Sequence, residues 1–440
     1  MAELMDLARM ACAEAVKRGA QFADAETSRG RSLSVNVEKN GIHDTSEKHS
    51  AGVSVRSIIK GATGLAQCSA LGAKDVLETA KRSAEAARLA QSDPDFVSLP
   101  EPCAYREVPG LHDERLAALS IGDLIGMLVA EVDAAREVSP EVMVQGGASL
   151  GVSERALASS LGVSFADRKT SVGLHVFCIV KHGDDVGSFY DFDFARRAED
   201  FSPRGLGAAV CREAVGFLGS RSIKSGTLPV IFGPLVTGSL FQAIAASASA
   251  EEIQRGRSYL VGKRGARIGR ETLTLRDDAY IPGGMASGPC DGEGAARRQV
   301  TVVERGVLVN HLHGSYTAHK AHEPNTGHGG RGGGVWPTNV VPELGPAPAA
   351  QLIADTREGL YVNMGSVFPH PVTGDISATI DFGHKIENGK LAYPLKNTML
   401  GLNVFELLAN LEAISSDFRA EPGMVLPTVL IRGAKVAGAS

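Results

Sequence analysis

The sequence predicts an α+β protein with two domains, each having a mostly antiparallel sheet and a few long helices. A chain of 440 residues exceeds what one ordinary hydrophobic core accommodates, which indicates more than one domain. Short runs of alternating apolar residues recur along both halves, and several are joined by turns that contain glycine. The few helical patterns stand between groups of strands, which favours α+β over an alternating parallel sheet.

The N-terminal half begins with a helical pattern, because apolar residues recur at helical spacing as far as Gly19, a suitable C-terminal cap. Asn40-Gly41 and Lys60-Gly61 then mark turns between strands. The expected elements are a helix over 2–18, strands over 33–37, 53–59 and 63–66, helices over 74–89 and 121–136, strands over 142–150, 162–165, 173–180 and 188–194, and a helix over 205–218. A junction at 219–226 gives domains of residues 1–222 and 223–440.

The C-terminal half opens with a strand over 228–232, and the breaker Gly233-Pro234 then starts a helix over 235–253. From Ala243 to Ala250 most side chains of this helix are very small, which allows another backbone to pack close against it. The other expected elements are strands over 273–275, 299–304, 306–312, 359–362, 377–387, 391–394 and 428–431, and a helix over 404–414.

The composition is that of a globular protein, with 43% apolar and 22% charged residues. Acidic and basic residues are interspersed and give a net charge of −5, which argues against a dedicated nucleic-acid binder. No run of about 18 apolar residues predicts a membrane span. The N-terminus carries Glu3 and Asp6 instead of the basic start of a secretory signal. The six cysteines form no C-x-x-C pair, so we expect reduced, mostly buried thiols in a cytoplasmic protein.

Four sequence blocks in the C-terminal half carry a family resemblance. They are Asp291-Gly292-Glu293-Gly294 followed by Glu304-Arg305-Gly306-Val307-Leu308, Ser315-Tyr316-Thr317-Ala318 with 325–330, Pro371-Val372-Thr373-Gly374-Asp375 with 386–389, and the closing segment 430–438. Each block alone is weak evidence, but their common order resembles the TldD/PmbA peptidases. The resemblance covers essentially the whole chain and is strongest from Gly226 to Gly438.

Residues that differ from those of the TldD branch indicate which branch of the family this chain resembles. In the TldD branch the helix after the first C-terminal strand carries His-Glu-x-x-x-His, which binds zinc together with a C-terminal cysteine. The matching hexapeptide here is Phe241-Gln242-Ala243-Ile244-Ala245-Ala246, and Val425 stands at the place of the cysteine. Phe241, Ala246 and Val425 have no group that coordinates zinc, and Gln242 replaces the glutamate. The resemblance therefore implies the PmbA branch, also called TldE, with no catalytic or metal-binding residue and no cofactor in this chain.

The resemblance implies a subunit that pairs with a zinc-bearing TldD-like partner in a heterodimer or higher assembly. Such a pair cleaves unfolded peptides, for example a microcin precursor or an antitoxin, within an enclosed chamber. Two alternatives stay open: a non-proteolytic binding or regulatory protein of the gyrase-modulator type, and a stand-alone hydrolase that uses His311 and His313. Pairing of isolated chains with themselves also stays open.

The histidines between 311 and 328 are the rival metal site, together with Glu323. His322 and His328 lie six residues apart with Pro324 between them, whereas the zincin pair sits four residues apart on one helix. His311 and His313 would share one face of a strand, which is better geometry for two ligands. Exposed loop histidines or contacts to a partner would explain the same residues.

The chain contains a glycine-rich segment, Gly327-His328-Gly329-Gly330-Arg331-Gly332-Gly333-Gly334. It lacks the lysine of a phosphate-binding loop. It is either a turn region that needs positive φ or a stretch of backbone that contacts a peptide. In the resembling family such a loop lies near the substrate chamber. We therefore expect substrate contacts from Tyr316, Thr326, Gly327, His328, Gly329, Gly330 and Arg331, with His328 and Arg331 the most important side chains.

Overall fold

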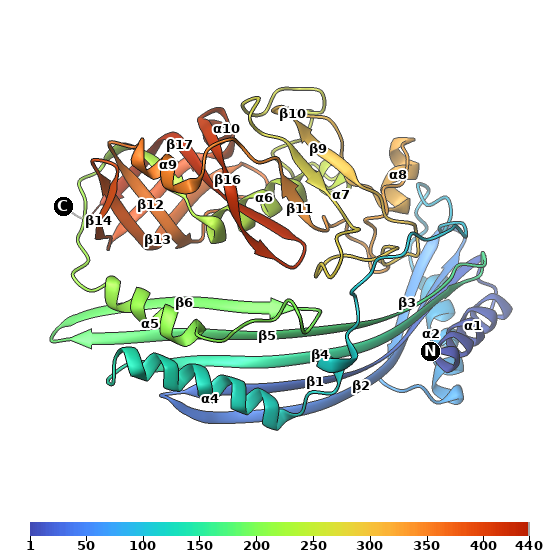
Figure 1. Cartoon of the computed structure of the whole chain (residues 1–440). Coiled ribbons are helices and arrows are strands. Elements are labelled where there is room, and N and C mark those ends of the chain that lie inside the picture. The colour runs from blue at the N-terminus through green and yellow to red at the C-terminus, as the bar shows by residue number, and fades with distance from the viewer. Residues whose placement is uncertain (439–440) are drawn as a thin grey trace.

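The computed structural model describes residues 1–438 and shows antiparallel sheets with helices packed on them (Figure 1). This confirms the predicted α+β class. The N-terminal sheet has six antiparallel strands in the order β3-β2-β1-β4-β5-β6. Its strands are β1 (Phe22–Glu38), β2 (Gly41–Ile59), β3 (Ala62–Cys68), β4 (Met143–Ser159), β5 (Ser164–His182) and β6 (Asp185–Ala195).

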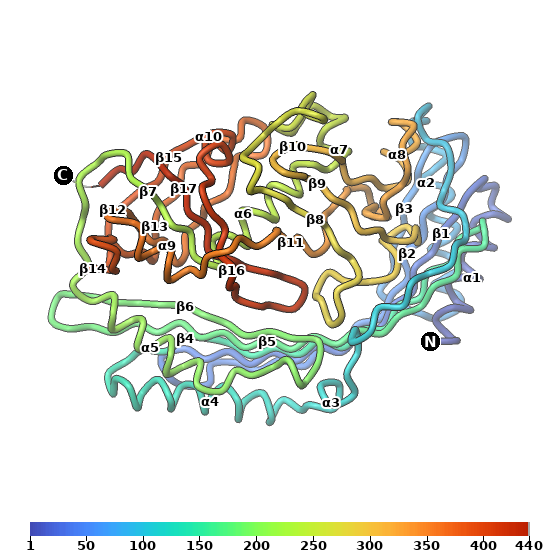
Figure 2. The backbone as a smooth tube through the Cα atoms, turned by 45° about the horizontal axis from the view of Figure 1, so that its top comes forward, coloured from blue at the N-terminus to red at the C-terminus, as the bar shows by residue number. Residues whose placement is uncertain are grey.

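Helices cover only one face of the N-terminal sheet. These helices are α1 (Ala2–Lys17), α2 (Ala73–Leu89), the one-turn α3 (Glu114–Ala117), α4 (Ile121–Val138) and α5 (Leu206–Gly216). Two apolar cores form beneath them, one from α1 and α2 on β1 and β2, the other from α4 and α5 on the sheet's opposite end. The C-terminal half lies on the side of the sheet away from α4, as Figure 2 shows.

The C-terminal half contains two more sheets. The larger has seven strands: β7 (Gly226–Phe232), β12 (Glu358–Gly365), β13 (Asp375–Glu387), β14 (Lys390–Pro394), β15 (Thr398–Asn403), β16 (Leu411–Glu421) and β17 (Met424–Gly438). The smaller has β8 (Leu275–Asp277), β9 (Val300–Glu304), β10 (Val307–Leu308) and β11 (Val340–Pro342). The helices here are α6 (Pro234–Ser247), α7 (Ala250–Gln254), α8 (Ser315–Ala321), α9 (Ala349–Ala354) and α10 (Val404–Ala409). One apolar core joins α6 to both sheets.

Two predicted helices are wrong in extent. The helix expected over 235–253 is broken after Ser247, because the Ala250 N–H donates to Leu312 O and the Leu312 N–H donates to Ala248 O. These bonds to a neighbouring segment replace the helical ones. The helix expected over 404–414 ends at Ala409, and its last part belongs to β16, which pairs with β17.

Several other predictions are confirmed with changed bounds, but the strand expected over 306–312 is wrong in extent: it is only β10, and His311 and His313 lie beyond its end. Lys60 and Gly61 form the expected turn, with φ of 52° and 76°. The strand expected over 173–180 lies within β5, and the one expected over 162–165 overlaps β5 only at Ser164 and Phe165. All six cysteines are free thiols, and four of them are buried. The predicted junction at 219–226 lies between α5 and β7, and the domain boundary at residue 222 stays a prediction.

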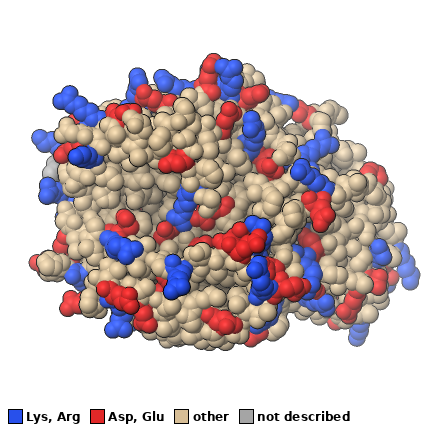
Figure 3. All heavy atoms as spheres, viewed as in Figure 1, with Lys and Arg blue, Asp and Glu red and all other residues tan. Residues whose placement is uncertain are grey.

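Charged side chains of both signs are mixed over the face of the molecule drawn in Figure 3. This agrees with the charge pattern of the sequence. Among residues 1–438, no helix has the length and apolar character needed to cross a membrane.

Candidate functional site

The glycine-rich loop, residues 327–334, is fixed at its beginning and exposed further on. Gly329 donates its N–H to Asp291 Oδ2 over 2.8 Å, and Gly327 adopts φ of 72° with a carbonyl oxygen where a Cβ would stand. Gly332 and Gly333 are exposed. Only the second part of the loop is therefore accessible to a ligand.

His328 lies inside the protein, with 3% of its surface exposed. Its Nε2 is 2.9 Å from Asp277 Oδ1 on β8, and its Nδ1 is 2.9 Å from the hydroxyl of Thr326. That carboxylate also accepts hydrogen bonds from the backbone and hydroxyl of Thr338. Both ring nitrogens thus make internal contacts, so the geometry supports a role of His328 in fixing the loop.

The other predicted contact residues are spread over different surroundings. Thr326 Oγ1 lies 2.7 Å from His313 N and 2.9 Å from His313 O, which ties the loop to a preceding segment. Tyr316 is on α8, where burial and the nearby carboxylate of Asp93 raise the pKa of its hydroxyl. Arg331 alone among the predicted side chains both lines a cavity and carries a charge. Substrate contact for the whole set stays a prediction.

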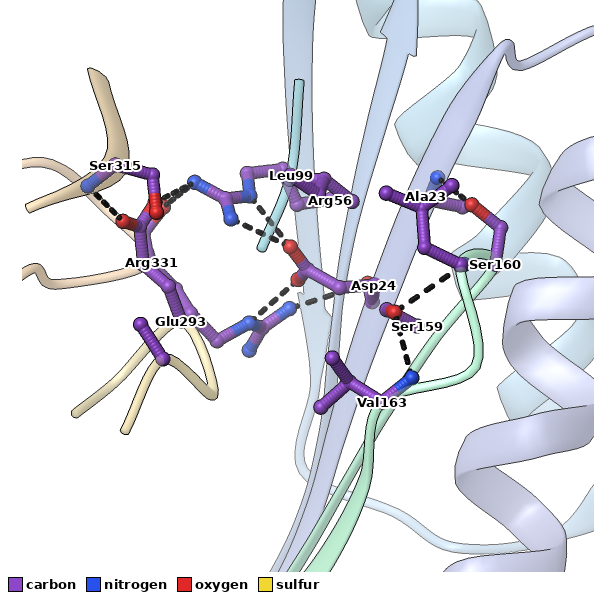
Figure 4. Close-up of polar contacts among 12 residues, drawn as sticks. Ala23, Asp24, Arg56, Leu99, Ser159, Ser160, Val163, Glu293, Ser315 and Arg331 are labelled. Carbon is purple, nitrogen blue, oxygen red and sulfur yellow. Dashed lines mark hydrogen bonds and ion pairs between the residues drawn. The ribbon is translucent and has the colours of Figure 1, made fainter. Parts of the chain in front are cut away.

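Arg331 belongs to a group of four charged side chains that joins the two halves of the chain, shown in Figure 4. We call this group the ion cluster: Asp24 on β1, Arg56 on β2, Glu293 and Arg331. Arg56 Nε donates to Asp24 Oδ2 over 2.7 Å, and Arg331 Nε donates to Asp24 Oδ1 over 2.6 Å. Arg56 Nη1 donates to Glu293 Oε1 over 3.0 Å.

The ion cluster is buried and electrically balanced. None of its four side chains is more than 8% exposed, and two carboxylates face two guanidinium groups. Burial opposes the charge on Asp24, but Arg56 and Arg331 outweigh it and hold the pKa of Asp24 below its ordinary value. Asp24 therefore stays charged, and its ion pair with Arg331 fixes the loop on the N-terminal sheet.

The turn that supplies Glu293 is organised by Asp291. Asp291 Oδ1 accepts the N–H groups of Glu293 and Ala295, both over 2.9 Å, and Oδ2 accepts that of Gly329. Burial, and after it the neighbouring Glu293, raise the pKa of Asp291 to about 6. Glu293 Oε2 in turn accepts the N–H of Ser315 over 3.0 Å. The D-x-E-G block thus connects the glycine-rich loop, α8 and the ion cluster.

A cavity of about 580 Å³ opens beside the exposed part of the loop. It is lined by residues of β1, β2 and β3, by the residue after β3, by Gly292 of the D-x-E-G block and by the loop: Glu26, Ser28, Ser50, Ala51, Gly52, Val53, Ser54, Leu65, Gln67, Cys68, Ser69, Gly292, Arg331 and Gly332. This volume falls within the range of small-ligand sites. Arg331 in its wall already pairs with Asp24, so the lining presents mainly hydroxyl, amide and backbone groups.

The four positions matched to the family's zinc site do not suit zinc. Phe241 is 2% exposed and packs in the apolar core that joins α6 to both sheets. Gln242 and Ala246 are half-buried on the same helix, and Val425 is half-buried on β17 opposite Ala420. Zinc in proteins takes thiolate, imidazole or carboxylate ligands, none of which these residues offer. The residues present therefore do not fit the metal.

α6 and β17 still meet closely beside these positions. The hydroxyl of Thr237 donates to Pro427 O over 2.6 Å, and a Cβ on Gly238 would lie 2.8 Å from Leu426 Cδ2. This close approach is made at the beginning of the helix, by Thr237 and Gly238, and not by the small residues from Ala243 to Ala250 on which the prediction rested.

The guanidinium of Arg264 lies beside the histidine cluster, through its ion pair with Glu323. His311 and His313 have ring centroids 6.4 Å apart, and His313 Nε2 is 3.9 Å from Glu323 Oε2. Arg264 forms an ion pair with Glu323, and burial lowers the pKa of His311 to about 4. Within residues 1–438, no group of three or more His, Cys, Asp or Glu side chains has metal-binding geometry.

No local sequence pattern predicted Asp24, Arg56 or Asp277 as site residues, and Glu293 stood out only as part of a motif. A charged residue within the apolar run Ala23-Asp24-Ala25 is a signal that could have marked Asp24. Its partners lie 32 and 307 positions away along the chain, so spacing cannot identify them.

Comparison with known proteins identifies the family of the chain. Models for the three domains of PmbA/TldA metallopeptidases match residues 23–87, 114–218 and 225–438. The chain is 30% identical over 314 residues to a metalloprotease of Methanothermobacter thermautotrophicus, covering 65% of this chain and 68% of the relative. It is 24% identical over 362 residues to metalloprotease PmbA of Escherichia coli O157:H7, covering 77% of each. The crystal structure of TldE from Thermococcus kodakarensis is similar, with a TM-score of 0.90, 25% identity, and coverage of 99% of this chain and 100% of that one.

These matches define a chain assembled from metallopeptidase domains. It belongs to the PmbA/TldA metallopeptidase family that the sequence blocks predicted, within the PmbA/TldE branch that Phe241, Gln242, Ala246 and Val425 indicated.

Proposed function

We propose that this chain is the metal-free subunit of a two-chain metallopeptidase that degrades or processes unfolded peptides. A TldD-like partner carries the zinc and the catalytic groups, while this chain completes the chamber and holds peptide. The chemistry of the four positions Phe241, Gln242, Ala246 and Val425 carries the proposal. In particular, the ring of Phe241 is part of the apolar core, so this position of α6 contributes packing where the TldD branch has a zinc ligand.

The test compares the purified chain with its complex. The chain is produced alone and together with a homologue from the same organism that has the His-Glu-x-x-x-His motif. Zinc is measured in both preparations, and cleavage is measured on a denatured, fluorescently labelled protein. We expect substoichiometric zinc and no cleavage for the chain alone, and stoichiometric zinc with chelator-sensitive cleavage for the complex.

A matched control separates assembly from catalysis. A partner in which the first histidine of its motif is replaced by alanine should still form the complex but lose cleavage. Cleavage by this chain alone in excess chelator would contradict the proposal, as would the absence of any stable complex.

A stand-alone hydrolase at His311 and His313 is the second candidate. One observation favours it: in the described chain, both ring nitrogens of His313 and Nε2 of His311 are buried without a hydrogen-bond partner. Arg264 beside Glu323 counts against it, because a resident guanidinium disfavours a second cation. Stoichiometric zinc that is lost in the His311→Ala, His313→Ala double variant would favour this candidate over the first.

A further inference from the structure

We propose that a basic groove beside α10 binds a small anion, namely a phosphate ester carried on a flat ring, as in a nucleotide. The basic groove is a cavity of about 690 Å³ between α10 and the segment 263–271, which precedes β8. α10 lies on the side of the C-terminal half that is far from the N-terminal sheet (Figure 1). The lining shares no residue with that of the 580 Å³ cavity, so the proposal goes beyond the proposed function.

The first observation is a concentration of positive charge on an acidic protein. The eight residues from Lys263 to Arg270 include four basic side chains and no acidic one, although the whole chain has a net charge of −5. Lys263, Arg267 and Arg270 line the groove, and among the described residues Glu271 is the single acidic member of the lining. The groove therefore attracts anions on a chain whose overall charge repels them.

The second observation is that this positive charge is only partly neutralised. Glu271 accepts from Arg267 over 3.5 Å and from Arg305 over 3.0 Å, so two guanidinium groups share one carboxylate. Within residues 1–438, Lys263 and Arg270 have no carboxylate oxygen within 4.0 Å. Two cations of the lining are therefore left for a ligand to neutralise.

The third observation is that the charged wall is held in place without a ligand. Arg270 Nε donates to Ala409 O at the end of α10 over 3.1 Å, which leaves the two Nη atoms of Arg270 to contact an anion. The neighbouring Glu412 accepts from Arg432 over 2.8 Å instead. Arg267 Nη1 donates to a backbone carbonyl over 3.0 Å. Side chains fixed in this way lose little conformational entropy on binding, and a guanidinium group presents paired N–H donors to phosphate oxygens.

The fourth observation is an apolar surface next to these charges. Phe405 lines the groove and is half-buried, and its ring packs edge-on against Tyr259 with a centroid distance of 5.7 Å. Lys263 Nζ lies 5.7 Å from the centre of the Phe405 ring, so positive charge and aromatic surface are adjacent. Ile268, which is 4% exposed, and Ala266 continue the apolar surface. A ring joined to a phosphate would cover both parts of the groove.

A basic face that contacts only water, or one that binds an acidic segment of another protein, would match the charge alone. Neither explains why the unpaired cations surround a hollow with an aromatic residue in its wall. The volume is within the range of small-molecule sites, about 300–1,000 Å³. The observations therefore favour a compact ligand that has a charged end and a flat apolar end.

The binding experiment uses the full chain without added zinc or partner, by isothermal titration calorimetry at low salt. Its probes are AMP, which has a ring and a phosphate, adenosine, which has only the ring, and inorganic phosphate, which has only the charge. We expect AMP to bind at least about tenfold more tightly than either other probe, because each of these lacks one set of contacts. Equal affinity for AMP and either other probe would overturn the proposal, as would binding of polyglutamate without binding of AMP.

Matched variants test the two ends of the ligand. Lys263→Gln should weaken AMP binding by about tenfold, because a charge-assisted hydrogen bond to the phosphate is lost. Lys224→Gln is the control, because it removes the same charge from an exposed lysine outside the lining, and it should bind AMP as the unmodified chain does. Phe405→Leu should weaken AMP binding by about fivefold through loss of the ring contact. Equal binding by the two lysine variants, or unchanged binding by Phe405→Leu, would contradict the proposal.

Chemical modification gives a second measurement that needs no variant. N-succinimidyl acetate acetylates exposed lysines, and mass spectrometry follows Lys263 and Lys224 in the same sample. Saturating AMP should slow the modification of Lys263 several-fold and leave that of Lys224 unchanged. Equal rates at Lys263 with and without AMP would overturn the proposal. Neither measurement depends on zinc or on partner-dependent cleavage, so the outcome is independent of the proposed function.

Discussion

Replacing Asp24 by asparagine tests whether the ion cluster joins the two halves of the chain energetically. Asp24→Asn keeps the shape of the side chain but removes the charge that faces Arg56 at 2.7 Å and Arg331 at 2.6 Å. Glu293 still pairs with Arg56, so Arg331 is left buried without a carboxylate partner. Breaking a buried ion pair on one side costs about 3–5 kcal/mol, and we expect a loss of that size in the free energy of unfolding.

The assay is urea unfolding followed by circular dichroism and by the fluorescence of Trp336. This is the single tryptophan, 67% exposed beside the glycine-rich loop, so its signal reports on the loop. Glu14→Gln is the control, because Glu14 accepts from the half-exposed Arg18 within one helix, a type of pair worth about 0.3–0.5 kcal/mol. A loss for Asp24→Asn no larger than that of the control would refute the reasoning.

A double variant adds a sharper test. Asp24→Asn with Arg331→Met restores electrical balance, since Arg56 and Glu293 remain as a pair. Its loss of unfolding free energy should therefore be smaller than the sum of the two single losses by about 1–3 kcal/mol.

The same ion pairs predict a pH dependence. The pKa of Asp24 is lowered in the folded chain, so the stability that Asp24 contributes is present above the ordinary carboxyl value of about 3.9 and is lost as pH falls through the lower folded-state value. Additive losses in the double variant would contradict this account. So would a difference in stability between the unmodified chain and Asp24→Asn that disappears already near pH 6.

Three further predictions concern single sites. Gly327→Ala should lower the free energy of unfolding by more than about 2 kcal/mol, because φ is 72° and a carbonyl oxygen lies where the Cβ would be. Gly332→Ala is the control: no atom lies near its Cβ position, so the free energy should change by no more than about 0.5 kcal/mol in the same urea assay. Phe241→Ala should lower the free energy of unfolding by about 3–5 kcal/mol, because the ring packs in the apolar core. Gln242→Ala should change it by no more than about 0.5 kcal/mol, and equal losses in the two variants would mean that the Phe241 ring does not stabilise the core. Burial lowers the pKa of His311 to about 4, so its contribution to stability is complete above about pH 6.5 and falls as pH drops toward 4; unfolding measured across that range should show a smaller fall in His311→Gln.

Local patterns of the sequence were sufficient for most of the N-terminal half. The turn at Lys60 and Gly61 and the helix α2 follow from residues that are neighbours in the chain. The break after Ser247 does not, because it depends on Leu312, which comes 65 positions later and bonds to the backbone there. Propensity favours a helix across this point, and a tertiary contact overrides it.

The same distinction applies to the site. The motif blocks located Asp291, Glu293 and the glycine-rich loop, since these residues are close in sequence. The role of Arg331 depends on Asp24 and therefore on the packing of the two halves. Periodicity contains no information on that packing. His328 is a second example of a position that local sequence does not predict. A histidine in a glycine-rich loop suggests an exposed side chain, but contacts with Asp277 and Thr326 hold His328 inside the protein.

The ion cluster and the cavity share Arg331, and this links stability to binding. Arg331 Nη2 donates to Ser54 O over 3.0 Å, so the guanidinium bonds directly to β2 as well as to Asp24. The wall of the cavity is thereby held in place before any ligand arrives. A rigid wall reduces the conformational entropy that is lost when a ligand binds. A variant such as Asp24→Asn should therefore loosen the wall of the cavity even though Asp24 does not line it. Arg331→Lys should have the same effect, because an ammonium group cannot reproduce the fork of contacts to Asp24 and Ser54; unchanged hydrogen exchange at the Gly332 N–H in both variants would contradict this.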